Sequence, residues 1–133
     1  MAVKLTDEQA KLLRETKSFI HLATINKDGS PQVSPVWVDF DGAHVVINSE
    51  QRRRKVRNMK RDPRVSFSVQ DPANPYRYIE IRGRVVEITP KGGAEGIDKL
   101  AKKYMGVDKY PNNRPGDVRV VIKIEPEHIT GMG

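Results

Sequence analysis

The 133-residue sequence contains no cysteine, and this absence excludes disulfides, thiolate metal sites and cysteine nucleophiles. Its three histidines, His21, His44 and His128, are scattered, and none has a partner two to four residues further on with which to build a metal site. No serine lies in a nucleophile-elbow sequence, and no two carboxylates form an evident acid/base pair. We therefore expect no metal and no catalytic side chain. If the protein is an enzyme, a bound cofactor supplies the reactivity.

Long apolar runs are also missing, since none approaches the roughly 20 residues that a membrane-spanning helix needs. The first six residues do not resemble a signal peptide, so we expect a soluble cytoplasmic protein. The length suits a single domain over residues 1–133. With 37% hydrophobic and 31% charged residues, the composition favours a modest core completed by pairing with a second copy. The net charge of +7 favours anionic partners.

The pattern of strands and turns predicts a mainly β domain, either a barrel or a sandwich. A capping box at Thr6–Gln9 predicts a helix over about residues 7–16. Tight turns at Asp28-Gly29 and Asp41-Gly42 join three strands into an antiparallel meander. The six expected strands cover residues 19–25, 32–40, 43–48, 64–70, 76–89 and 118–124. A short basic helix ends at Pro63, a third helix covers about residues 94–105, and Gly83 marks a bulge or a close approach.

The basic helix is the most unusual segment. Residues 52–64 contain eight Arg or Lys against one acid, Asp62, and residues 48–51 (Asn-Ser-Glu-Gln) are expected to supply turn and cap chemistry. Cations in a first helical turn are unfavourable, because the exposed amide groups already make that end positive. We interpret the segment as an anion site where backbone donors and basic side chains converge. The alternative is a solvated basic face.

The second expected strand is also unusual. Residues 29–37 hold two prolines, Pro31 and Pro35, and the only tryptophan, Trp37. Proline removes a hydrogen-bond donor from the ladder and belongs at an edge or a bulge. A partly unpaired strand can offer its backbone groups to the rim of a flat heterocycle. The alternative is an ordinary edge strand.

Four motifs occur together and in order: Gly29-Ser-Pro-Gln-Val-Ser-Pro-Val-Trp37, Asn48-Ser49, the basic helix from Arg53 to Pro63, and the strand from Tyr78 to Glu87. Because it has these four motifs in this order, the segment of residues 8–131 resembles the split β-barrel flavoproteins of the pyridoxamine 5'-phosphate oxidase-like superfamily. Within it, the sequence is most similar to enzymes that use the deazaflavin coenzyme F-420 (flavin/deazaflavin oxidoreductase group B). The resemblance implies a split barrel and a homodimer with two cofactor sites across the subunit interface.

The resemblance also implies cofactor-binding residues. The ring system would be lined by Gln32, Val33, Ser34, Pro35, Val36 and Trp37 and bordered by Asn48 and Ser49. The phosphate would be bound by Arg53, Arg54 and Lys55. Tyr78 would reach the site from the partner subunit, with Tyr76 near the open side.

The implied activity is hydride transfer between coenzyme F-420 and a conjugated, electron-poor small molecule. Pyridoxamine phosphate oxidases carry a C-terminal tryptophan and arginine set, which the tail 127–133 lacks, and this disfavours vitamin B6 chemistry. An FMN-dependent reductase or oxidase and a nonenzymatic flavin or deazaflavin carrier remain alternatives. Binding of nucleic acid by residues 52–64 is disfavoured, because no aromatic residue is interleaved for base stacking and 17 acids offset much of the charge.

Overall fold

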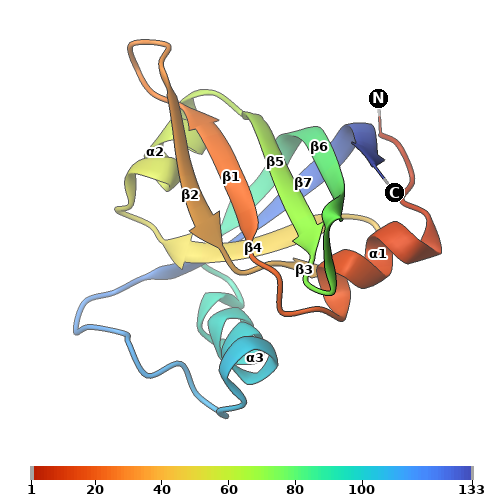
Figure 1. Ribbon diagram of the computed structural model, residues 1–133. Coiled ribbons are helices and arrows are strands. Elements are labelled where there is room, and N and C mark those ends of the chain that lie inside the picture. The colour runs from red at the N-terminus through yellow and green to blue at the C-terminus, as the bar shows by residue number, and fades with distance from the viewer. Residues whose placement is uncertain (1, 133) are drawn as a thin grey trace.

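A computed structural model describes residues 2–132, and it consists of one seven-stranded antiparallel sheet with three helices (Figure 1). The strands are β1 (Ile20–Ile25), β2 (Pro31–Val36), β3 (Asp39–Phe40), β4 (Val45–Glu50), β5 (Arg64–Asp71), β6 (Asn74–Thr89) and β7 (Arg119–Met132). The helices are α1 (Asp7–Arg14), α2 (Arg54–Arg61) and α3 (Gly93–Met105). None of these helices is long and apolar enough to cross a membrane.

The sheet curls because its two edges are neighbours in the chain. The strand order is β2-β1-β5-β6-β7-β4-β3, so β2 and β3 lie at opposite ends, yet only Trp37 and Val38 separate them in sequence. The curled sheet brings these edges together, and the predicted mainly β split barrel is confirmed (Figure 1). The strand count is seven rather than about six, since residues 32–40 form two strands.

The predicted three-stranded meander is wrong for a physical reason. The first part of residues 32–40 pairs with β1, and the last part pairs with β4. Between them the backbone of Val38 bonds to α3 instead of to a strand. Its amide donates to the hydroxyl of Tyr104 (3.2 Å), and its carbonyl accepts from Nζ of Lys103 (2.6 Å). Both backbone groups of Val38 are therefore satisfied where the chain leaves one edge and joins the other.

The same two side chains of α3 join three parts of the barrel. Lys103 also donates to the carbonyl of Leu13 in the last turn of α1 (2.6 Å), and Tyr104 donates to the carbonyl of Ser18 before β1 (2.7 Å). We call Val38 with its partners Lys103 and Tyr104 the seam. The seam fixes α3 against the end of the barrel where β2 ends.

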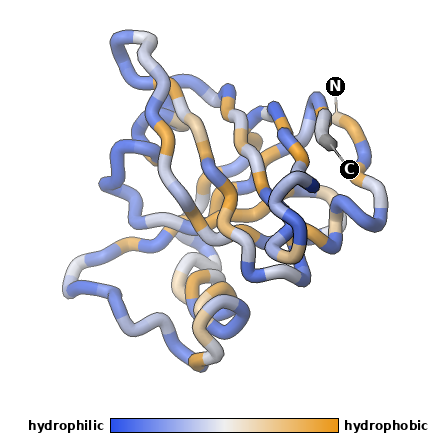
Figure 2. The backbone as a smooth tube through the Cα atoms, in the orientation of Figure 1, coloured by the Kyte–Doolittle hydropathy of each residue, from blue (hydrophilic) through white to orange (hydrophobic). Residues whose placement is uncertain are grey.

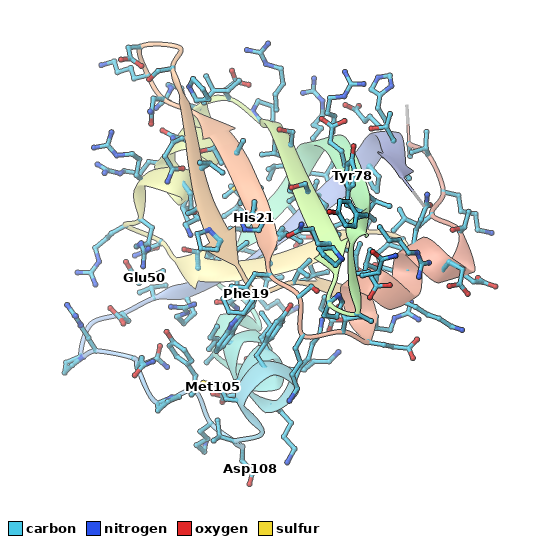
Figure 3. The ribbon with its side chains drawn as sticks, viewed as in Figure 1. Phe19, His21, Glu50, Tyr78, Met105 and Asp108 are labelled. Atoms are coloured by element: carbon cyan, nitrogen blue, oxygen red, sulfur yellow. The ribbon has the colours of Figure 1, made fainter. Side chains whose placement is uncertain are left out.

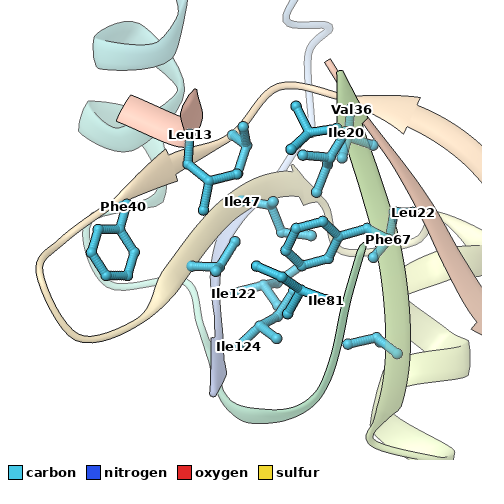
Figure 4. Packing of buried hydrophobic residues seen from close by; sticks show 14 of the residues in the cluster. Leu13, Ile20, Leu22, Val36, Phe40, Ile47, Phe67, Ile81, Ile122 and Ile124 are labelled. Atoms are coloured by element: carbon cyan, nitrogen blue, oxygen red, sulfur yellow. The ribbon is translucent and has the colours of Figure 1, made fainter. Parts of the chain in front are cut away.

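The core follows from the alternation along each strand. Side chains on the inner face are almost fully buried, and they meet Leu13 of α1 inside the curled sheet (Figure 4). Examples from five strands are Ile20, Leu22, Ile47, Phe67, Ile81, Ile122 and Ile124. Figure 2 shows hydrophobic residues along the strands and hydrophilic ones at the hairpin tips and in the segment after α3.

Two local sequence signals are confirmed. The capping box is formed, with the Thr6 hydroxyl accepting from the Gln9 amide (3.2 Å) and the Gln9 side chain accepting from the Thr6 amide (2.9 Å). At Gly83 the register of β6 and β7 shifts, and an added Cβ would lie 2.4 Å from the carbonyl oxygen of Glu125. Only glycine fits this close approach.

The seam yields a stability prediction. Tyr104→Phe removes the hydroxyl that bonds to Val38 and Ser18 but keeps the ring, so the amide of the buried Val38 and the carbonyl of Ser18 lose their partner. We expect the free energy of unfolding to fall by about 1–3 kcal/mol. Urea denaturation measures the change. The matched control is Tyr110→Phe, whose hydroxyl bonds to no described residue, and which should change stability by less than about 0.5 kcal/mol. Equal effects of the two substitutions would contradict this role of the seam.

Candidate functional site

A cavity of about 190 Å³ opens beside the seam, where the ends of β2 and β4 meet the starts of α2 and β7. Helix α3 and the segment 106–118 close its other sides. Its lining combines an aromatic and apolar wall with a cluster of cations. The lining residues are Phe19, Pro35, Val36, Trp37, Asn48, Ser49, Arg53, Lys55, Ile97, Tyr110 and Arg119.

The cations of this cavity are Arg53, Lys55 and Arg119, which we call the cation cluster. Lys55 is 7% exposed. Neither Lys55 nor Arg53 forms an ion pair or a side-chain hydrogen bond with any residue in the part of the chain that the structure describes. Burial, together with the charges of Arg53 and Arg119, lowers the pKa of Lys55 to about 8. A buried ammonium without a counter-ion is costly, and this cost points to a ligand that supplies the negative charge.

Arg119 is held in place by neutral partners. Its Nε donates to Oδ1 of Asn48 (3.0 Å), and its guanidinium lies 5.1 Å from the centre of the Tyr110 ring. The other end of the Asn48 amide donates to the carbonyl of Gly93 (2.9 Å), so this side chain connects Arg119 to the start of α3. Burial lowers the pKa of Arg119. The positive charge therefore faces the cavity without being neutralised.

The first turn of α2 adds backbone donors. Its N-cap is Arg53, which makes no side-chain cap bond, and the first turn holds no acid. The amides of Arg54 and Lys55 find no acceptor among residues 2–132. The expectation that residues 48–51 cap the helix is wrong, because Asn48–Glu50 continue β4 in its ladder with β7. The expected turn is formed, since the carbonyl of Glu50 accepts from the amide of Arg53 (3.0 Å). The uncapped amides and the cation cluster together make a site suited to an anion.

An aromatic wall stands next to the cluster. The Trp37 ring stacks on Tyr104, with centres 5.1 Å apart and planes within 4° of each other. Tyr110 meets Trp37 edge-on at 5.8 Å, and Phe19 meets Tyr104 edge-on at 5.4 Å. Phe19 remains 44% exposed near α3 (Figure 3). A flat apolar ligand can therefore pack beside the cations without opening the core.

The structure brings together seven of the residues implied by the resemblance: Pro35, Val36, Trp37, Asn48, Ser49, Arg53 and Lys55. The other six do not line this cavity. Gln32 accepts from Thr24 (2.9 Å) farther along β2, Val33 points outward, and the buried Ser34 hydroxyl has no partner among the described residues. Arg54 is exposed on the outside of α2.

The two tyrosines lie elsewhere. Tyr76 is 77% exposed, and Tyr78 lines a separate hollow together with Glu8 and Leu12 of α1. In Figure 3, Tyr78 lies beside β5 and β6, whereas Glu50 and Phe19 lie toward the end of the barrel that α3 covers. A role for the tyrosines in the same site requires a second copy of the chain.

Sequence reasoning missed four lining residues: Phe19, Ile97, Tyr110 and Arg119. Arg119 carries a weak signal, since it is a cation directly before the apolar run Val120–Ile122. Tyr110 carries none, because it lies in an irregular segment. Its position depends on a long-range bond from its amide to the carboxylate of Asp98 in α3 (2.8 Å).

Known proteins share the fold of this chain. Residues 5–133 match the family model described as pyridoxamine 5'-phosphate oxidase. The chain is similar to a solved structure named F-420 reductase, with 37% identity, a TM-score of 0.80, and coverage of 94% of this chain and 98% of that one.

Two more distant structures share the fold alone. A conserved hypothetical protein from Mycobacterium tuberculosis has 23% identity and a TM-score of 0.73, covering 98% of this chain and 86% of that one. The HupZ protein of Group A Streptococcus has 21% identity and a TM-score of 0.69, covering 96% and 93%.

The lowered pKa of Lys55 predicts a pH effect. The folded protein releases its proton near pH 8, whereas the unfolded chain holds it until about pH 10.5. The unfolded state therefore binds more protons in this window, so the free energy of unfolding rises with pH. Lys55→Met should remove this rise and, because it replaces a buried ammonium by an uncharged side chain of similar length, should stabilise the ligand-free protein at pH 7 by about 1 kcal/mol.

Urea denaturation at pH 7 and pH 10 tests this prediction. The control is Lys60→Met, at an exposed lysine near the other end of α2. It should leave the free energy of unfolding unchanged at both pH 7 and pH 10. Burial also lowers the pKa of Lys103 to about 8. Because Lys103 is present in the wild-type protein and in both variants, the difference in stability between them reports on Lys55 alone. A loss of stability in Lys55→Met at pH 7 would contradict the interpretation that the Lys55 ammonium is unpaired and destabilises the ligand-free protein.

Proposed function

Because the chain belongs to the pyridoxamine 5'-phosphate oxidase family, we propose that it is an oxidoreductase whose cavity beside the seam binds coenzyme F-420. The observation that carries the proposal is the cation cluster without a counter-ion among the described residues, placed next to a flat aromatic wall. A cofactor of this kind has both matching parts, a phosphorylated stem and a planar ring.

The residues present fit such a cofactor. Lys55, Arg53 and the free amides of the first turn of α2 would bind the phosphate, with Arg119 completing the positive surface. Pro35, Val36 and Trp37 would hold the ring through the backbone and the side chains at the end of β2. The Ser49 hydroxyl lines the same cavity and would donate to the polar rim of the ring.

When bound, the deazaflavin supplies the hydride for a conjugated, electron-poor acceptor. The protein would position the two molecules and exclude water. Tyr110 and Trp37 cover one side of the cavity, while the exposed Phe19 marks the open side on which an acceptor would lie. The described residues of the cavity include no carboxylate or histidine, so the cations are the groups that would stabilise charge on a reduced acceptor.

Coenzyme F-420 is preferred over FMN for two reasons. The neighbour named F-420 reductase aligns over nearly the whole chain at 37% identity. In addition, the exposed Arg54 and Arg61 extend the positive surface beyond the cavity along α2, which suits a cofactor with a longer anionic tail. FMN remains the second candidate, because the cation cluster itself is suited to either phosphate.

We also propose a homodimer. Val33 is 66% exposed on the outer face of β2, where its ladder partner is Ala23, and Phe19, just before β1, is 44% exposed. Exposed apolar side chains of this kind favour association. A partner on this face would bring its own side chains to the open side of the cavity. Tyr76 and Tyr78, which do not reach the cavity of their own chain, are the side chains we assign to this contact.

Titration with each cofactor, followed by ring fluorescence, tests the cofactor assignment, and Lys55→Ala tests the site. Since Lys55 makes a charge-assisted contact with the phosphate, its loss should weaken binding by about 1.5–3 kcal/mol. Lys60→Ala removes an equal charge from the exposed end of α2 and should change the dissociation constant much less. An unchanged dissociation constant in Lys55→Ala would remove the phosphate assignment, and full binding without turnover across a broad acceptor panel would favour a carrier.

The dimer prediction uses a pair of exposed valines. Val33→Glu places a charge on the proposed interface and should shift the protein to monomer, as light scattering after gel filtration would show. Val86→Glu, at a valine that is 47% exposed on β6, should leave the assembly unchanged. A monomeric wild-type protein, or equal assembly of both variants, would contradict the proposed interface.

A further inference from the structure

Two opposite charges lie directly across from each other at the edge of the cavity but do not pair. In the ladder of β4 and β7, Glu50 is the register partner of Arg119. Opposite charges in such positions are close enough to form a stabilising pair. Instead, Arg119 donates to Asn48 and lies over the ring of Tyr110.

The carboxylate of Glu50 is held by other groups. Its Oε1 accepts from both the backbone amide and Nε of Arg52 (2.9 Å each), and its Oε2 accepts from the amide of Val118 (2.9 Å). These bonds lower the pKa of Glu50 to about 2, the amide of Val118 making the largest contribution, so the side chain is fully ionised at neutral pH. Glu50 is only 7% exposed and thus is a strong potential competitor for the cation cluster.

Arg52 restrains a second acid in the same way. Its Nη2 donates to Oδ1 of Asp117 (2.9 Å), while Oδ2 of Asp117 accepts from the amide of Arg114 (2.8 Å). Both acids lie near enough to oppose the effect of burial on the pKa of Arg119. Arg52 is itself mostly exposed and does not line the cavity, so its contacts serve the acids rather than a ligand.

We propose that Arg52 is a positioning residue that holds Glu50 away from Arg119 and so keeps the cation cluster free to bind an anion. Without Arg52, the carboxylate across the ladder becomes the counter-ion of Arg119. An incoming phosphate must then displace the Glu50 carboxylate from Arg119, so the affinity of the protein for the phosphate falls. The inference rests on the proposed function, because the site must bind a phosphorylated ligand for the restraint to matter.

Binding to two variants tests the role of Arg52. Arg52→Gln removes the ion pairs that the Arg52 side chain makes with Glu50 and Asp117, so that only backbone amides still hold the Glu50 carboxylate. Arg57→Gln removes an equal charge from an exposed arginine of α2 that contacts neither acid. The probes are coenzyme F-420 and inorganic pyrophosphate, followed by the fluorescence of Trp37, the only tryptophan, which lines the cavity. We expect Arg52→Gln to weaken binding of both by about tenfold more than Arg57→Gln does.

Rescue separates positioning from simple loss of charge or of local structure. The double variant Arg52→Gln/Glu50→Gln lacks the competing negative charge at position 50. Its new amide side chain there still has an oxygen that accepts from the amide of Val118. Affinity should return to within about twofold of the Arg57→Gln protein. Equal affinities of the two single variants would overturn the inference, as would a double variant that stays as weak as Arg52→Gln.

A crystal structure of the ligand-free Arg52→Gln protein provides a readout that does not depend on the cofactor. We expect the Glu50 carboxylate to form an ion pair with the Arg119 guanidinium, which leaves Asn48. An Arg119 that stays on Asn48 would overturn the inference. Failure of the wild-type protein to bind either probe would contradict the proposed function, and this structure would still decide whether Arg52 separates the two charges.

Discussion

The central constraint in this molecule is positive charge that the protein concentrates but does not neutralise. Lys55 is buried at the start of α2, beside Arg53 and Arg119, at the helix end that is already positive. A sequence selected for stability alone would place an acid or a neutral cap there. Here the nearest acids are bound by Arg52 and by backbone amides, so the cost remains until an anion binds. Stability and function are therefore opposed at this position.

The barrel determines where this charge is displayed. The sheet edges meet at Trp37 and Val38, and the seam replaces the missing ladder with side chains of α3. Because Tyr104 both bonds to Val38 and stacks on Trp37, one residue closes the barrel and builds the aromatic wall. Asn48 then ties the start of α3 to Arg119. The wall and the cations are held at a fixed spacing by the same contacts that close the fold.

The sequence allowed prediction of features with a local cause. Neighbouring residues determine the capping box, the strands with clean alternation and the uncompensated basic segment. Gly83 could be singled out because a glycine inside a strand is a local signal, although its contact is with the distant Glu125. The split of residues 32–40 into two strands did not, because it depends on Lys103 and Tyr104, which lie more than 60 residues away. Arg119 and Tyr110 were missed for the same reason. Only the last part of the proline-containing stretch reaches the cavity, because the cavity lies at the end of β2 and residues 32–34 lie farther along the strand.

The most direct test of the central claim is a crystal structure of the protein with coenzyme F-420 bound. The account predicts the phosphate between Lys55, Arg53 and the first amides of α2, with the ring against residues 35–37. A phosphate on the exposed outer face of α2, or a ring bound away from Trp37, would contradict it.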